Sequence, residues 1–509
     1  MSDVSAPVVV TAAALKKKWR PSSCWALAIT AWVGFFGVGA GTLKWERHHG
    51  VGLNGDEPHY LISAIALMRF GSFRVTAAER WARLHQALGA GYAIPPLGHR
   101  APQGIYPAHE PGLAFLMAVP MLAGPHAAAL TMGALISAGF VGLSFLVWRS
   151  GGERRAWPLA LLGVVATPAT FMALNEIYPD LLSGVILALL IAVLVAMERS
   201  WEPGPGTVAL VGFTIGFLPW VHFKNLVPAL LVGVGIVVVL VRSAAPRRRF
   251  VALAGGLLPP LALLVVYNEM VFRSATSNVV LGHSVSLTVT RMVGLIADQQ
   301  HGVLVQQPWV VVGLAGMVLL RNRLRLSVLT ATAVLVVLWF LNGAAFNHYG
   351  GVSLVGRFEW ELFPILAVFA TLYLMDLRSR RRRLALGILG VCLTISVVGF
   401  VVVMTLDHHS FFNQADVASN WSTGRSFGWW PDLSVFPCLS SSCLDHAWSE
   451  AHNWWATMTV LGVAGTLTAI LVFWVSASRM ARLCAISGGV VASAGLIGIL
   501  LTPLPWVPQ

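Results

Sequence analysis

Residues 180–197 read DLLSGVILALLIAVLVAM, an apolar run in which the first residue, Asp180, carries the charge. A helix rising about 1.5 Å per residue needs about 20 such residues to cross a bilayer core of ~30 Å. Runs of this kind recur between residues 23 and 503. We expect about thirteen spans, near residues 23–43, 126–148, 156–174, 180–197, 207–219, 226–241, 250–272, 308–320, 326–341, 362–376, 384–406, 455–477 and 483–503. The pattern predicts an all-α polytopic membrane protein.

The composition and the placement of charge agree with a membrane chain. Of 509 residues, 57% are hydrophobic and 11% are charged, which excludes an average soluble globular protein. The net charge of +13 does not indicate a nucleic-acid partner, because the basic clusters fall in loops on one side of the predicted spans. These clusters are Lys16 to Arg20, Arg149 to Arg155, Arg242 to Arg249, Arg321 to Arg325, Arg378 to Arg383 and Arg479 to Arg482. The pattern predicts a cytoplasmic N-terminus.

This topology divides the chain into three parts. Residues 1–22 are expected to form a cytoplasmic tail, and residues 23–380 a transmembrane module that includes the outer loop 44–110. Residues 381–509 are expected to add C-terminal helices around a second outer loop, 407–453. We expect no large soluble domain.

The first outer loop is expected to contain short helices of its own. One begins at Pro58 and the other at Pro111, because proline is favoured at the first helical position. A carboxylate precedes each of them. The helix N-termini suit a phosphate-bearing substrate, and the carboxylates before them suit a cation. The alternative interpretation is ordinary helix capping.

Acidic residues gather on the predicted outer rim. Asp56 and Glu57 follow the first span, and Glu176 and Asp180 form a second acidic motif between two spans. Adjacent carboxylates at a bilayer surface indicate general-base chemistry or cation binding, although solvated loops and polar turns have the same composition. No cofactor is fixed by the sequence. A divalent cation, Mg²⁺ or Mn²⁺, is a candidate, with Asp56, Glu57 and Asp180 as its candidate ligands.

Two isolated cations on the same rim are candidates for binding phosphate. Lys224 provides a point charge, and Arg357 provides a guanidinium that can bind two oxygens. The alternatives are snorkelling of Lys224 to the interface and an ion pair of Arg357 with Glu359 or Glu361. Further candidates for donor-phosphate contacts lie in the same outer segments: Tyr60, His109, His222 and His301.

The second outer loop contains two cysteines, Cys438 and Cys443. An oxidising compartment favours a disulfide between them. The alternative is a zinc site completed by His446 and His452, whose spacing also fits a metal.

These motifs resemble the GT-C superfamily of integral-membrane glycosyltransferases, which use polyprenyl-phosphate sugars as donors. The resemblance covers roughly residues 20 to 380. It rests on the run Gly-Asp-Glu-Pro-His-Tyr at 55–60, on Tyr106 to Pro111, on Glu176 to Asp180, on Asp-Gln-x-x-Gly at 298–302 and on Gly356-Arg357-Phe358. Many members have Pro-Pro where this chain has Glu110-Pro111, and the family's large C-terminal soluble domain is not expected here.

The resemblance implies a function and roles for these residues. Asp56 looks like a general base that deprotonates an acceptor hydroxyl during inverting transfer, with Glu57 beside it. Glu57, Glu176 and Asp180 would position the acceptor or a cation, and Lys224 and Arg357 would stabilise the departing lipid phosphate. The implied partners are a polyprenyl-phosphate-linked sugar donor, a glycan or lipid acceptor and membrane lipids.

Two other functions use the same groups. A transporter or flippase of a lipid-linked or anionic substrate would place its binding site near the bilayer midplane, whereas these charges lie at span ends. A polymerase or ligase of lipid-linked saccharides would use a diphosphate donor and would be better served by more external arginines.

Overall fold

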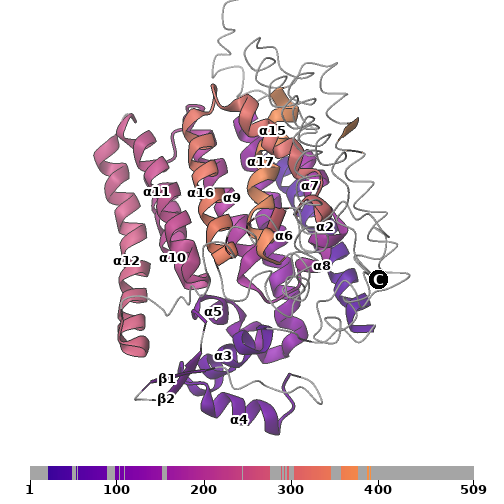
Figure 1. The fold of residues 1–509 in the computed structure, drawn as a ribbon, viewed down its shortest axis with the longest axis vertical. Helices are drawn as coiled ribbons and strands as arrows, with labels where there is room; N and C mark the ends of the chain where they lie inside the picture. Colours follow the sequence, from indigo (N-terminus) through magenta and orange to yellow (C-terminus); the bar gives the residue numbers. More distant parts are fainter. Residues whose placement is uncertain are drawn as a thin grey trace, which may run out of the picture.

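The computed structural model describes residues 21–376, with gaps at 49–52, 54–55, 89–97, 102–103, 108, 152–157, 244, 275–287, 289–291, 293–294, 297–302 and 345–356, together with residues 387, 388 and 390. The described residues form a bundle of long helices that run side by side. Short helices and a small β-ribbon gather at one end of the bundle (Figure 1).

Helices that are long and apolar enough to cross a membrane make up most of the bundle. In the described part of the chain there are 6 such segments: α2 (Pro21–His48), α6 (Pro125–Gly151), α9 (Pro179–Glu198), α11 (Leu226–Val241) with the preceding turn η2 (Phe223–Asn225), α12 (Pro246–Phe272) and α16 (Arg325–Ala344). Shorter apolar helices accompany them: α10 (Pro205–Val221), α15 (Val310–Leu320) and α17 (Phe363–Asp376). The predicted all-α, multi-pass fold is confirmed.

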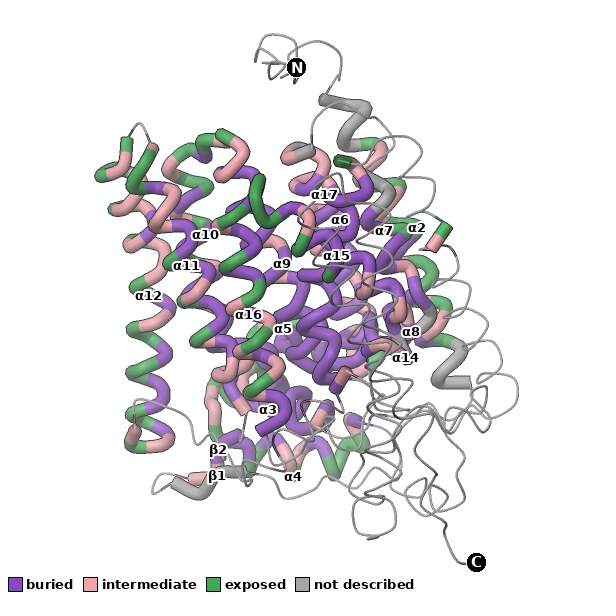
Figure 2. Tube along the Cα trace, turned by 45° about the horizontal axis from the view of Figure 1, so that its top comes forward, coloured by how far each residue is buried: buried purple, intermediate pink, exposed green. Residues whose placement is uncertain are grey.

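Helix α9 lies at the centre of the bundle. Its span is 89% buried inside the protein, whereas the span of α12 is 22% buried. Figure 2 shows α12 at the edge of the bundle. Helix α9 packs against α6, α11, α16 and α17. A helix that is apolar on all sides belongs in such an interior position, and its N-terminal turn therefore lies among several other helix ends.

The single span expected over residues 156–174 is a broken helix. It consists of α7 (Pro158–Val165) and α8 (Pro168–Ala173), and Thr167 between them has an extended backbone and accepts a hydrogen bond from the Thr170 amide. The break occurs here because Pro168 has no amide proton with which to continue the helix. The Gln307 amide, after α14 (Val303–Gln306), donates to the Thr167 hydroxyl at 2.8 Å and ties the break to the next helices.

The segment between α2 and α6 forms the layer at the end of the bundle. The helices predicted at Pro58 and Pro111 are confirmed as α3 (Glu57–Phe70) and as α5 (Gly112–Ala118), which is followed by the turn η1 (Pro120–Ala123). Two features were not predicted: α4 (Thr76–Leu84) and an antiparallel ribbon of β1 (Gly98–Ala101) and β2 (Gly104–Pro107). Figure 1 shows α3, α4, α5 and the ribbon together.

Other predictions concern residues that the structure does not describe. They are His301, the outer loop 407–453 with Cys438 and Cys443, and the spans expected over 384–406, 455–477 and 483–503, apart from residues 387, 388 and 390. They stay predictions.

Candidate active site

Charged residues from distant parts of the chain meet at the end of the bundle. Each lies at a helix end or just before a helix: Asp56 before α3, His109 before α5, Asp180 in the first turn of α9, Lys224 in η2, and Arg357 and Glu361 in the turn η4 (Arg357–Glu361) ahead of α17. Helix N-termini and turns can hold polar side chains because their backbone groups are not all used within the helix.

Asp56 has a positively charged partner and an imidazole beside it. Its Oδ2 lies 3.2 Å from Arg357 Nη1, and its Oδ1 lies 3.7 Å from His109 Nε2. The Tyr60 ring stacks on the His109 ring with 4.8 Å between centroids. Burial alone would raise the pKa of Asp56, but His109 and Arg357 outweigh it and hold the pKa below its ordinary value. The carboxylate is therefore ionised in this arrangement.

Arg357 connects the two acidic motifs. In addition to its contact with Asp56, its Nε lies 3.1 Å from Asp180 Oδ2, and its guanidinium lies over the Tyr178 ring at 4.2 Å. Burial lowers the pKa of Arg357, but the two carboxylates outweigh it and the net shift is upward. The cation is thus fixed between Asp56 and Asp180, and of the two alternative partners considered above, Glu361 pairs with Lys224 instead.

Lys224 points into this cluster, and its side chain is largely covered. Its side chain is 9% exposed, and its Nζ lies 2.7 Å from Asp180 Oδ1 and 3.1 Å from Glu361 Oε2. Just before it, His222 Nδ1 accepts a hydrogen bond from the Lys224 amide at 3.2 Å. Burial lowers the pKa of His222 to about 4, so this imidazole is neutral near pH 7 and serves as a cap for the turn.

Glu361 and Asn342 were not predicted as site residues. Asn342 accepts a hydrogen bond from Lys224 Nζ at 3.1 Å, and its amide nitrogen donates to the Phe358 carbonyl at 3.1 Å. Burial raises the pKa of Glu361 to about 7, with Asp180 adding to the shift and Lys224 opposing it. The sequence feature that could have identified them is their position, because Asn342 lies near the end of the apolar helix α16 and Glu361 lies just before the apolar helix α17.

A glycine in α9 lets η4 approach the cluster. A Cβ atom on Gly184 would lie 2.5 Å from the Trp360 carbonyl oxygen and 2.7 Å from the Glu361 Cα. Contacts this short do not occur for real side chains. Gly184, one helical turn after Asp180, therefore sets how closely Arg357 and Glu361 approach α9.

Glu57 connects the two acidic motifs, and Glu176 lies in the second of them. Glu57 Oε1 accepts a hydrogen bond from the Ile177 amide at 2.9 Å, which ties the start of α3 to the second acidic motif. Both carboxylates are buried. In the described residues, His, Cys, Asp and Glu side chains form no group of three that could hold a metal ion. The divalent cation stays a prediction.

His59 is a further polar group that was not among the predicted site residues. It is 5% exposed, and its ring centroid lies 6.1 Å from that of His109. Among the described residues, its Nε2 has no hydrogen-bond partner. Burial lowers its pKa, so the imidazole is neutral near pH 7. A buried ring nitrogen beside Asp56 is available to a hydroxyl group.

The cluster alternates in charge. Asp56, Arg357, Asp180 and Lys224 follow one another in contact, and their formal charges cancel while Glu361 is protonated. Two buried cations held by carboxylates can exchange part of their contacts for a phosphate. An ionised carboxylate beside them can accept a proton.

Searches against known proteins gave a small set of similarities. No protein-family model and no curated protein matches this chain. Two solved structures are similar to it: ArnT from Cupriavidus metallidurans in the apo state, with 14% identity and a TM-score of 0.45, and the same protein bound to undecaprenyl phosphate, with 14% identity and a TM-score of 0.42. Each similarity covers 94% of this chain and 75% of the other.

Proposed function

We propose that this protein is a membrane glycosyltransferase of the GT-C type. It moves a sugar from a polyprenyl-phosphate donor to a glycan or lipid acceptor at the outer face of a bacterial inner membrane. The observation that carries the proposal is the placement of Arg357 between Asp56 and Asp180, with Lys224 on the other side of Asp180. This arrangement puts a proton acceptor next to positive charge that suits a departing phosphate.

The reaction follows from these positions. The acceptor hydroxyl oxygen attacks the anomeric carbon as its proton passes to the Asp56 carboxylate. The bond between that carbon and the phosphate oxygen breaks, and the electron pair leaves with the lipid phosphate. Arg357 and Lys224 stabilise the negative charge on the phosphate as it develops. Attack from the side opposite the leaving group inverts the anomeric configuration.

Donor binding would also change the basicity of Asp56. In the free protein, Arg357 helps to hold the pKa of Asp56 low, and a carboxylate in that state is a weak base. A donor phosphate competes with Asp56 for the Arg357 guanidinium. The pKa of Asp56 then rises, and the carboxylate becomes a better proton acceptor when the donor is in place.

The position of the charges supports transfer over transport. Asp180 is the second residue of α9, Lys224 precedes α11, and Glu361 precedes α17. A transport site is expected near the bilayer midplane, within the spans. Groups at helix ends instead suit a reaction with a lipid phosphate at the membrane surface.

Purified protein in lipid, given a panel of labelled polyprenyl-phosphate sugars and an envelope acceptor fraction, tests the proposal. We expect transfer by the wild type and at least a 100-fold loss in Asp56→Asn, the scale of a lost general base. Glu202→Gln is the matched control, because Glu202 is 55% exposed and pairs with Arg249 outside the cluster. Chelation with EDTA tests the predicted divalent cation. Transfer by Asp56→Asn at the control rate, or labelled lipid moving across the bilayer without transfer, would overturn the proposal.

A further inference from the structure

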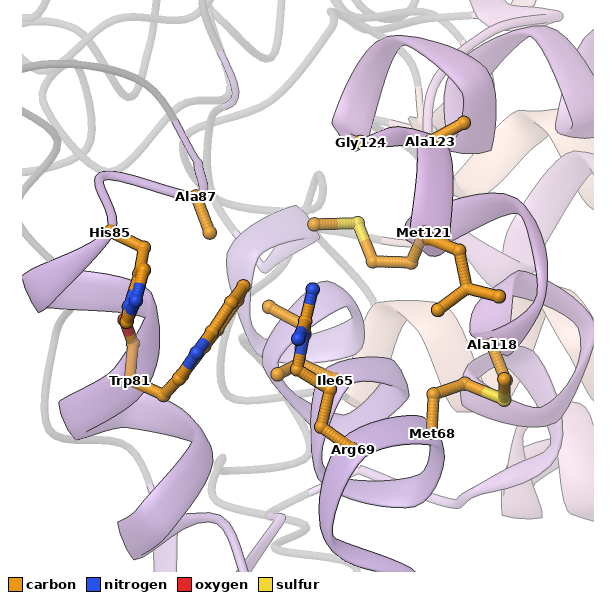
Figure 3. A pocket seen from close by; sticks show the side chains of 11 residues that line it. Ile65, Met68, Arg69, Trp81, His85, Ala87, Ala118, Met121, Ala123 and Gly124 are labelled. Carbon is orange, nitrogen blue, oxygen red and sulfur yellow. The ribbon is translucent and has the colours of Figure 1, made fainter.

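A cavity of about 280 Å³ lies between the C-terminal half of α3, helix α4 and the turn η1. One of its walls is a stack of three side chains, shown in Figure 3 with Trp81 between His85 and Arg69. The Arg69 guanidinium lies 3.9 Å from the centre of the Trp81 ring, and the His85 ring stacks on Trp81 at 4.5 Å. The His85 Nδ1 also lies 2.9 Å from the Trp81 carbonyl oxygen, which fixes the stack on α4.

The opposite wall of this cavity is apolar. Ile65 and Met68 on α3 and Met121 and Leu122 on η1 line the space. Figure 3 shows the Arg69 guanidinium between the Trp81 ring and the methionines. Methionine side chains adapt their shape to a flexible ligand. The cavity thus combines one cation with a lining that suits a hydrocarbon chain.

Arg69 is available to an anion. It lies in the last turn of α3 on the exposed surface, and within the described residues its recorded contact is the one with Trp81. At about 1.5 Å per residue, α3 separates it from Asp56 by roughly 20 Å. A sugar phosphate held at Arg69 is too far away to react at Asp56, so this cavity is separate from the candidate active site.

The lining of the cavity includes exposed apolar side chains. Leu122 is 59% exposed and Met68 is 37% exposed. Large apolar side chains gathered around one cation are characteristic of a membrane-facing surface, and they are uncommon on a surface that faces water. The ligand is therefore expected to come from the bilayer.

We propose that this cavity binds an anionic phospholipid. The phosphodiester contacts the Arg69 guanidinium, and one acyl chain lies along Ile65, Met68 and Met121. The volume is slightly below the usual range of about 300–1,000 Å³ for pockets that enclose a whole small molecule. It fits a phosphate and part of one chain, with the remainder of the lipid in the membrane.

Native mass spectrometry of the full-length protein, titrated with phosphatidylglycerol and with phosphatidylcholine, tests this inference. We expect the wild type to retain phosphatidylglycerol preferentially. Arg69→Gln should weaken that binding by about fivefold to tenfold, the effect of one cation near a lipid surface. Leu122→Trp should weaken it by filling the chain side of the cavity with Arg69 still present.

Arg80→Gln is the matched control. Arg80 is an exposed arginine on α4, next to Trp81 in the sequence, and it does not line the cavity. Thermal unfolding of each variant confirms that the fold is kept. The inference is overturned if Arg69→Gln and Leu122→Trp bind phosphatidylglycerol like the wild type, or if Arg80→Gln weakens binding as much as Arg69→Gln. Displacement of phosphatidylglycerol by an equal concentration of polyprenyl phosphate, with loss of that competition in Arg69→Gln, would assign the cavity to the donor instead.

Discussion

Replacing Gly184 by alanine adds a single methyl group at the contact between α9 and η4. The added Cβ would lie 2.5 Å from the Trp360 carbonyl oxygen, where ordinary contacts begin at 3.4 Å, so η4 must retreat by about 0.9 Å. Arg357 and Glu361 lie in η4 and would move with it. An ion pair that now measures 3.1 Å, from Arg357 to Asp180, would approach the 4 Å limit of such contacts.

Two effects of opposite sign act on the stability of this variant. Alanine in a helix gains about 1 kcal/mol over glycine, and overpacking costs about 1–3 kcal/mol. Gly163→Ala in α7 is the matched control, because an added Cβ there meets nothing within 4 Å and the variant should show the gain alone. We therefore expect Gly184→Ala to be less stable than Gly163→Ala by about 1–3 kcal/mol in the free energy of unfolding.

Transfer should respond more strongly than stability. A displacement of about 1 Å in a catalytic group can reduce a rate by about 100-fold. The measurement is sugar transfer by both variants, alongside thermal unfolding in the same detergent. If Gly184→Ala matches Gly163→Ala in both, the approach of η4 to α9 does not set the geometry of the site.

Three further changes test single groups of the cluster. Arg357→Lys keeps the charge but replaces the planar guanidinium that contacts both carboxylates. We expect at least a tenfold loss of transfer, from about 1.5–3 kcal/mol for the lost charged hydrogen bond to Asp56. Transfer equal to the wild type would contradict the bridging role. In the wild type, the KM for the donor should rise as the pH increases through about 7, because the Glu361 carboxyl becomes ionised and its charge then opposes a phosphate. Glu361→Gln should remove most of this pH dependence. The pKa of Glu361 is raised by folding from 4.5, so its neutral form favours the fold, and the stability of the wild type should fall as the pH rises from about 4.5 to about 7, a decline that Glu361→Gln should reduce. His59→Phe removes the Nε2 atom, for which the described part of the protein provides no hydrogen-bond partner. The variant should therefore stay as stable as the wild type while transfer falls, and loss of stability with unchanged transfer would show a purely structural role.

The sequence was most informative where one residue decides the local structure. Proline fixes its own backbone angle and lacks an amide proton, so Pro58 and Pro111 marked the starts of α3 and α5 within one residue. The same chemistry at Pro168 breaks the span expected over 156–174. That break was missed because apolar composition continues across it.

The pairing of the charged groups was not accessible from the sequence. Asp56 and Arg357 are 301 residues apart, and nothing in their neighbours specifies the contact. Lys224 and Arg357 were identified as isolated cations, but Glu361 and Asn342 were not singled out as site residues, because polar residues at the ends of apolar helices are common. Their role depends on the packing of α9, α16 and η4, which local periodicity does not encode.

The long separation between the members of the cluster affects its biogenesis. Asp180 and Lys224 are separated by 44 residues, whereas Arg357 follows Asp56 by 301 residues. At a synthesis rate of about 5–20 residues per second, Lys224 is made within roughly 2–9 s of Asp180, but Asp56 waits roughly 15–60 s for Arg357. During that interval the nascent chain has an acidic residue at the membrane surface without its final partner, and water or the insertion machinery must stabilise it until the last turn of the site is made.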